Sequence, residues 1–140
     1  MKRFVLFGFL AVLLVAGCEL FPNITWEDIK GEWDFPDTTF NDSTIKSIHL
    51  SLMDPGEGES EYRIDLSWEN GDNYLLHYGE GSMDKNVFSG TYNLGGDYTD
   101  STTYSVTVTF TLNNDQLKAV FTGTGPLNGL VLEHGTLNAG

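Results

Sequence analysis

Three histidines are the first residues of this chain that could carry out chemistry. His49, His77 and His134 are distant in sequence, but strands far apart in a chain can be neighbours in a barrel, so their ring nitrogens could meet on a metal ion. Their spacing matches no metal-binding motif, and the alternation around His49 places it on the solvent face of its strand. We therefore expect unrelated surface histidines and no metal site.

Acidic residues gather in two stretches that contain glycine and could supply oxygen ligands to Ca²⁺. Neither stretch has the ligand spacing of an EF-hand, so we expect solvated acidic loops. The chain also has no nucleophile elbow and no histidine whose spacing implies an acidic partner. An enzyme is therefore not expected, and no catalytic residue or cofactor is assigned. The two acidic stretches hold Asp54, Glu57, Glu59 and Glu61, and Asp97 and Asp100.

The chain begins with the pattern of a secretory signal peptide. Lys2 and Arg3 provide the positive start, residues 4–15 are apolar and uncharged, and residues 16–17 are small. The apolar run is well short of the roughly 20 residues that a membrane-spanning helix needs. We expect residues 1–17 to be removed on export.

The only cysteine, Cys18, directly follows this apolar run. Val15, Ala16, Gly17 and Cys18 resemble the lipobox of bacterial lipoproteins. The resemblance implies that the Cys18 thiol receives a diacylglyceryl group, that the chain is cut before it, and that the new amino group is acylated. Two or more acyl chains hold a protein stably on a membrane. We expect a lipid-anchored protein of the cell envelope, and Glu19 after the cysteine favours the outer membrane.

The mature chain is strongly acidic and forms one domain. Loss of Lys2 and Arg3 leaves five of the seven basic residues against 20 acidic ones, a net charge of −15. This charge repels nucleic-acid phosphates, so a nucleic-acid partner is not expected. With a single cysteine, no internal disulfide is available, and packing alone must stabilise the fold. We expect a lipidated N-terminus and tether over 18–25 and a single barrel domain over 26–140.

Period-two alternation of apolar and polar residues predicts an all-β domain. Along 102–112, Tyr104, Val106, Val108 and Phe110 should be buried while Thr107 and Thr109 face water, and along 61–69 Trp68 should be buried while Arg63 and Asp65 are exposed. Turn residues such as Asn70 and Gly71, 84–86 and 113–115 separate the segments. The expected strands are Gly31 to Phe35, Thr44 to Met53, Glu61 to Glu69, Asn73 to Gly79, Asn86 to Asn93, Thr102 to Leu112, Gln116 to Gly123 and Gly129 to Leu137.

Short connections favour pairing in sequence order, and glycines within strands help a sheet to curl. The predicted fold is an antiparallel up-and-down β-barrel of about eight strands, and a two-sheet β-sandwich is the alternative. The spacing of Thr25 and Asp28 predicts one helical turn before the first strand.

A helical turn followed by Gly31, Glu32 and Trp33 resembles the start of a lipocalin or related calycin barrel. The resemblance implies that Gly31 and Trp33 help to close one end of the barrel, with Trp33 packed across that end. It also implies that the barrel binds a small apolar ligand. Trp26, in the lead-in turn, is expected to contribute less to stability than Trp33.

About ten aromatic residues could either line a ligand cavity or fill a core. An eight-stranded barrel has room for side chains or for one small ligand. The candidate pocket residues are Tyr62, Trp68, Tyr104 and Phe110. Two functions therefore stay open: a small apolar ligand bound in the barrel mouth, or a filled barrel that engages another envelope or host protein.

Overall fold

A computed structural model describes residues 24–69, 74–78, 84–93 and 102–139, with 75–78 described by their backbone. The leader, Cys18 and the tether up to residue 23 lie outside the described residues, as do Asp97, Asp100 and the turn at Asn70 and Gly71. The expectations for these positions stay predictions.

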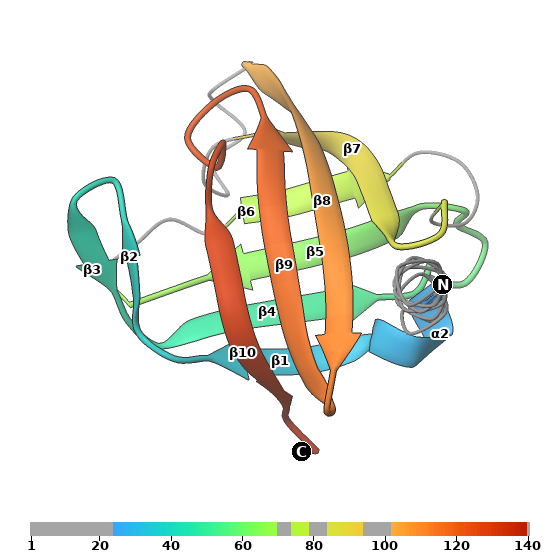
Figure 1. The fold of residues 1–140 in the computed structure, drawn as a ribbon. Helices are drawn as coiled ribbons and strands as arrows, with labels where there is room; N and C mark the ends of the chain where they lie inside the picture. Colours follow the sequence, from blue (N-terminus) through green and yellow to red (C-terminus); the bar gives the residue numbers. More distant parts are fainter. Residues whose placement is uncertain (1–23, 70–73, 79–83, 94–101, 140) are drawn as a thin grey trace, which may run out of the picture.

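The described chain contains one short helix followed by strands (Figure 1). Each segment that the alternation predicted contains a strand, and the bounds of β1 and β9 agree with the prediction. The elements are α2 (Trp26–Ile29), β1 (Gly31–Phe35), β2 (Thr38–Phe40), β3 (Ser43–Ile45), β4 (Ile48–Met53), β5 (Tyr62–Ser67), β6 (Tyr74–Tyr78), β7 (Val87–Asn93), β8 (Thr103–Asn113), β9 (Gln116–Gly123) and β10 (Val131–Leu137).

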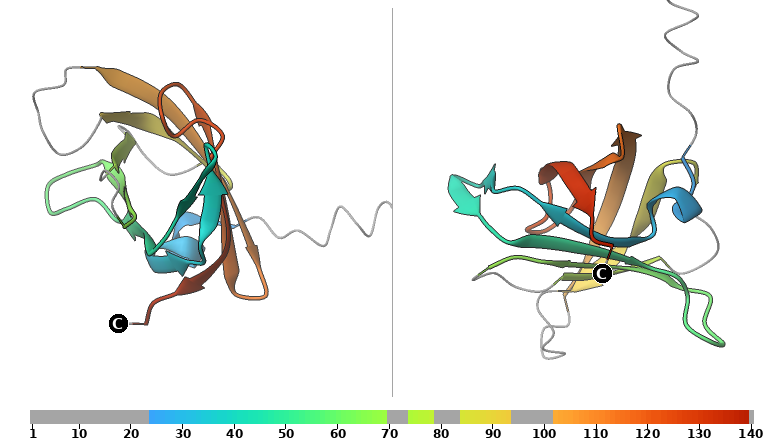
Figure 2. Two further views of the ribbon diagram at one scale, coloured as in Figure 1. Left: turned by 90° about the vertical axis from the view of Figure 1, so that its left-hand side faces the viewer. Right: turned by 90° about the horizontal axis from the view of Figure 1, so that it is seen from below.

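Eight of these strands close into an antiparallel barrel in the order β1-β10-β9-β8-β7-β6-β5-β4. From β4 to β10 each strand pairs with the next one in sequence, and β1 lies between β10 and β4. Figure 2 shows the barrel from two further sides. The predicted up-and-down barrel is confirmed, and its arrangement is consistent with a lipocalin-like fold. Closure through β1 removes the two free sheet edges that a sandwich would keep.

The predicted strand from Thr44 to Met53 is interrupted, which corrects the sequence analysis. Ser47 has a φ of 52°, so β3 ends at Ile45 and β4 begins at Ile48. β3 instead pairs with β2, a strand that the alternation did not predict, in a small separate hairpin. Asn41 and Asp42 form its turn with φ values of 50° and 61°, the left-handed pair that a type I′ turn requires.

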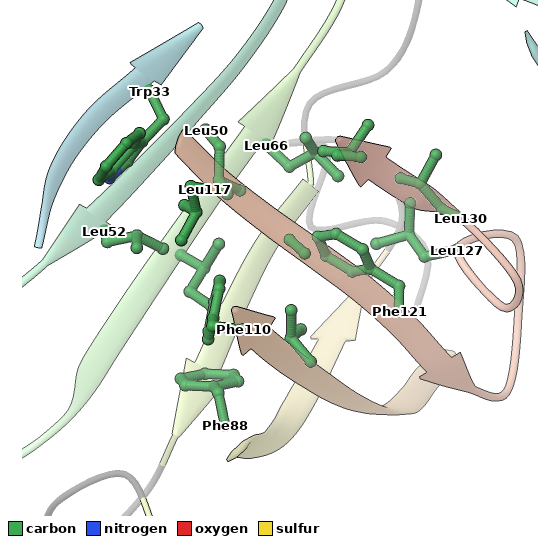
Figure 3. Close-up of a cluster of buried hydrophobic side chains, with 14 of the residues drawn as sticks. Trp33, Leu50, Leu52, Leu66, Phe88, Phe110, Leu117, Phe121, Leu127 and Leu130 are labelled. Atoms are coloured by element: carbon green, nitrogen blue, oxygen red, sulfur yellow. The ribbon is translucent and has the colours of Figure 1, made fainter. Parts of the chain in front are cut away.

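The barrel interior is filled from all sides by apolar side chains. Along β8, Val106, Val108 and Phe110 are buried, and the threonines between them point outward and are half-buried. In Figure 3 the labelled side chains point toward one another; most come from strands around the barrel, and Leu127 and Leu130 come from the loop between β9 and β10. Trp68 and Tyr104 are half-buried, not buried as predicted, because they lie at strand ends. The described buried residues form one contiguous cluster.

The helix α2 covers one end of the barrel, which we call the closed end (Figure 1). The Asp28 carboxylate accepts hydrogen bonds from the Thr25 N–H at 2.7 Å and the Thr25 hydroxyl at 3.0 Å, and these bonds hold the predicted turn. Trp33 is buried, and its indole N–H donates to the Ile29 carbonyl at 2.7 Å. This bond ties β1 to the helix before it.

Trp26 is as well buried as Trp33, which was not expected from its place in the lead-in turn. Its exposed fraction is 5%, against 3% for Trp33. Its indole N–H donates to the Asp54 carboxylate at 2.8 Å, and its ring lies 5.0 Å from that of Tyr62. The helical turn therefore inserts a core residue into the closed end, a placement that depends on β4 and β5.

Candidate functional site

The four candidate pocket residues do not share one site. Phe110 is fully buried at the barrel centre, and Tyr62 lies at the closed end against Trp26. Trp68 and Tyr104 lie at the opposite end, which we call the mouth, where the β2–β3 hairpin and the β9–β10 loop are found (Figure 1). Tyr62 and Trp68 flank the same strand, so a rise of about 3.3 Å per residue separates them by about 20 Å.

Aromatic rings form a continuous row at the mouth, which we call the mouth row. Trp68 lies 5.1 Å from Tyr74, Tyr74 lies 6.1 Å from Tyr92, and Tyr92 lies 5.4 Å from Tyr104, measured between ring centres. These separations are typical of favourable aromatic contacts. The rings come from β6, β7, β8 and the end of β5, so the row bridges strands around one side of the mouth.

The loop between β9 and β10, residues 124–130, folds into the mouth, and we call it the plug loop. Leu127 is 1% exposed and Leu130 is fully buried. The Tyr92 hydroxyl donates to the Thr124 carbonyl at 2.8 Å and accepts from the Leu127 N–H at 3.1 Å. Burial raises the pKa of Tyr92 above its ordinary value, so the hydroxyl keeps the proton that it donates. The plug loop is thus fastened to the mouth row.

Gly125 is the glycine of the plug loop that packs directly against the mouth row. Its φ is 76°, and a Cβ placed there would lie 2.5 Å from the Tyr104 ring and 2.8 Å from the Tyr92 hydroxyl. A side chain would therefore collide with two rings of the mouth row in a backbone conformation that already disfavours it. The close approach of this backbone to the rings leaves little space between loop and row.

An open cleft of about 480 Å³ lies outside the plug loop, beside the β2–β3 hairpin. We call it the rim cleft. Its floor includes Ile45, which is buried, and the half-buried Trp68, and its other lining groups are polar or charged. The backbone N–H of Glu69 donates to the Lys46 carbonyl at 2.8 Å and closes one side. The lining residues are Ser43, Thr44, Ile45, Lys46, Trp68 and Glu69.

Lys46 and Glu69 are the charged residues of the rim cleft, and neither has an ion-pair partner among the described contacts. Lys30, Arg63 and Lys118 each lie within ion-pair distance of a carboxylate elsewhere on the barrel. Glu27 and Asp54 raise the pKa of Lys30, and Lys118 lowers the pKa of Glu133. In this acidic chain most described cationic side chains therefore pair with a carboxylate of the same chain, while the Lys46 ammonium can pair with a carboxylate of a bound molecule.

Two acidic residues of the first stretch, Asp54 and Glu59, contact side chains of the same fold. The Asp54 carboxylate accepts from Trp26 and from the Lys30 ammonium at 3.0 Å, and Glu59 pairs with Arg63 at 2.7 Å. No group of three or more His, Cys, Asp or Glu side chains that could hold a metal ion occurs among the described residues. The oxygens of Asp54 and Glu59 thus bind side chains of the same fold.

His49 and His134 lie on the outer face and form no metal-binding group among the described residues, and the side chain of His77 lies outside the described part of the chain. His49 contacts the Asp34 carboxylate through Nδ1 at 2.9 Å, and His134 contacts the Gln116 side chain at 3.2 Å. The sequence analysis missed Asp34 as the partner of His49, because the two are brought together by the β1–β4 register. Ser67 is the cross-strand neighbour of His49, but no hydrogen bond joins them in the described part. The pair is solvent-exposed, and the Asp34 carboxylate also accepts a hydrogen bond from the Asn138 side-chain amide at 3.2 Å.

Comparisons with protein-family models, with curated proteins and with solved structures found no match for this chain. Among the described residues, no helix is both long enough and apolar enough to span a bilayer. The site must therefore be interpreted from its own geometry, and among the described residues the rim cleft, next to the mouth row, offers a candidate binding site.

Proposed function

We propose that this chain is an exported lipoprotein, anchored through Cys18, whose filled barrel presents a protein-binding site at the rim cleft. The observation that carries the proposal is the placement of Leu127 and Leu130 in the mouth. The space that a lipocalin-like barrel would offer to a small apolar ligand is occupied here by side chains of the plug loop. The binding surface that stays open is the rim cleft.

The orientation of the barrel supports a site at the mouth. Ile24 and α2 lie at the closed end, and residues 19–23 between Cys18 and Ile24 span at most about 18 Å when extended. A lipid anchor on Cys18 would therefore keep the closed end near the membrane. The rim cleft, on the opposite end, would face away from the membrane, where a partner can reach it.

A photo-crosslinking experiment in cells tests this proposal. A photoreactive amino acid is placed at Glu69 in the rim cleft and, as the matched control, at Glu57, an exposed acidic residue in the loop near the closed end. We expect one defined protein adduct from position 69, its loss in a Trp68→Ala background, and no such adduct from position 57. Equal adducts from both positions, or none from position 69, would contradict a rim-cleft site.

A second candidate function is binding of a small apolar ligand at the mouth, as the lipocalin-like resemblance implies. The mouth row favours it, since four aromatic rings lie side by side there. A rim cleft of about 480 Å³ also falls within the roughly 300–1,000 Å³ of small-molecule pockets. Native mass spectrometry of the lipoprotein extracted from membranes distinguishes the two functions, because a retained small ligand adds a discrete mass beyond the acyl chains.

A further inference from the structure

The outer edge of β3 forms one wall of the rim cleft. The hairpin register pairs Phe40 with Ser43 and Thr39 with Thr44. A two-residue turn is closed by a hydrogen-bonded pair, so Phe40 and Ser43 exchange backbone bonds. The next pair is then the non-hydrogen-bonded one, and the N–H and C=O groups of Thr39 and Thr44 point away from each other, toward the two outer edges of the hairpin.

The backbone groups of Thr44 point into the cleft. Lys46 is two residues further on and shares this direction, and its carbonyl accepts the Glu69 N–H across the cleft at 2.8 Å. The edge that carries Thr44 is therefore the edge that faces Trp68 and Glu69. No described strand pairs with β3 on this side. No backbone hydrogen bond to Thr44 on this side occurs among the described residues, so within that part of the chain the edge presents a donor and an acceptor beside a half-buried indole.

We propose that an extended peptide segment of a partner protein adds to β3 as a third strand in the rim cleft. This inference rests on the proposed function and names the form of its partner. The segment exchanges two backbone hydrogen bonds with Thr44 and accepts a third from the Lys46 N–H, at the strand spacing of about 4.8 Å. The type I′ turn of the β2–β3 hairpin sets the twist of the edge to which the segment adds.

Two side chains determine which segment fits. Trp68 offers a partly exposed ring face on the cleft floor, which suits an apolar side chain of the segment. The Lys46 ammonium has no described ion-pair partner, so it suits a carboxylate. The segment should therefore alternate apolar residues toward Trp68 with a Glu or Asp placed opposite Lys46.

A second copy of this chain fits the edge less well than a peptide does. β3 has three residues, and two mature copies would each bring a net charge of −15. Stable dimers bury about 800 Å² per partner, far more than a three-residue edge provides. A flexible peptide needs only the short edge and the indole. The mass of the purified protein in detergent tests the alternative directly.

The experiment uses the full-length chain expressed with its leader and extracted from membranes in detergent. The probes are fluorescent, end-blocked heptapeptides in which Thr alternates with Leu, Val, Phe, Glu or Lys, and binding is measured by anisotropy. Thr44→Pro removes the N–H on the cleft edge, and Thr39→Pro, the matched control, removes the N–H on the opposite edge of the same hairpin. N-methylation of alternate peptide bonds in the probe blocks one of its two edges and leaves the protein untouched.

Strand addition predicts a specific pattern. Thr44→Pro should weaken the best probe by about tenfold, the equivalent of one lost backbone hydrogen bond, while Thr39→Pro should leave it unchanged. N-methylation should abolish binding on one peptide edge only. Lys46→Glu should reverse the preference of the protein from Glu-containing to Lys-containing probes.

Other outcomes overturn the inference in distinguishable ways. Binding that survives Thr44→Pro and N-methylation on both edges but is lost in Trp68→Ala would reject strand addition and keep the rim cleft as the site. Binding that is unaffected by Trp68→Ala and Thr44→Pro would reject the proposed function as well. Absence of binding to every probe, or a Thr44-dependent dimer, would reject the peptide partner.

Discussion

The hydroxyl of Tyr92 accepts a hydrogen bond from the backbone N–H of Leu127, a residue that lies in the plug loop and is 1% exposed. The distance between the two atoms is 3.1 Å, and the residues are 35 positions apart in sequence. This contact joins the aromatic mouth row to the loop that fills the mouth. The Tyr92 hydroxyl thus adds to the backbone hydrogen bonds that join the plug loop to β9, such as the bond from the Phe121 N–H to the Leu130 carbonyl.

Tyr92→Phe should therefore destabilise the protein by about 1–3 kcal/mol, because it leaves the buried Leu127 N–H without its acceptor. Chemical denaturation monitored by circular dichroism measures the free energy of unfolding. Tyr104→Phe is the matched control, since no hydrogen bond of the Tyr104 hydroxyl occurs among the described contacts. A loss that is equally large for Tyr104→Phe would show that the Tyr92 hydroxyl does not fasten the loop.

Leu127→Ala should open an apolar cavity in the mouth and lower the free energy of unfolding by about 2–5 kcal/mol. The same variant should bind a small apolar probe such as benzene, detected by NMR shifts of residues around the mouth, because apolar cavities of this kind stay dry. Leu137→Ala, at a side chain that is 53% exposed, should change neither property appreciably. Benzene binding to the unmodified protein at the same site would mean that the mouth is already open.

Trp33→Ala and Trp26→Ala should both be strongly destabilising, by about 3–5 kcal/mol each. Both rings are buried at the closed end, and both indole N–H groups donate hydrogen bonds, to Ile29 and to Asp54. Thermal denaturation of the two variants measures the effect. A small decrease in melting temperature for Trp26→Ala alone would mean that the buried Trp26 ring contributes less to stability than Trp33, as its position in the lead-in turn suggests.

The Glu133 carboxyl should titrate with a pKa below its ordinary value of 4.5, because the Lys118 ammonium donates to its carboxylate at 2.8 Å. A lowered folded-state pKa means that the stabilisation from this pair is present above pH 4.5 and is lost as the pH falls through the folded pKa. Carbon-detected NMR titration of Glu133 measures the shift. In Lys118→Gln the titration should move back toward the ordinary value, and an unchanged midpoint would remove Lys118 as the cause.

Cys18→Ser should release the protein from the membrane fraction while the barrel stays folded, because in the proposed lipoprotein the acyl chains on Cys18 would provide the attachment and the acidic surface would not. Fractionation of cells that express the variant, with circular dichroism of the released protein, tests both parts. Retention in the membrane fraction to the same extent as the unchanged chain would remove the lipobox interpretation, and with it the argument that the closed end faces the membrane.

The sequence by itself determined where the barrel strands lie and, along β8, which face is buried. Alternation along β8 placed Val106, Val108 and Phe110 inside, because side chains of an extended chain must point to opposite faces. The hairpin turn of Asn114 and Asp115, with φ values of 50° and 61°, followed from residues that tolerate the left-handed conformation. These features depend on neighbours along the chain, which a sequence displays directly.

Tertiary structure alone decided how the two ends of the barrel are built. Several features of the two ends could not be predicted from local patterns. They are the break at Ser47, the pairing of β2 with β3, the burial of Trp26 against Asp54, and the burial of Leu127 in the mouth. Asp34 and His49 also meet across the β1–β4 register. A local pattern specifies which residues form a strand. The register between strands decides which residues become neighbours across the barrel, and the filled mouth and the outer edge of β3 beside it depend on that register.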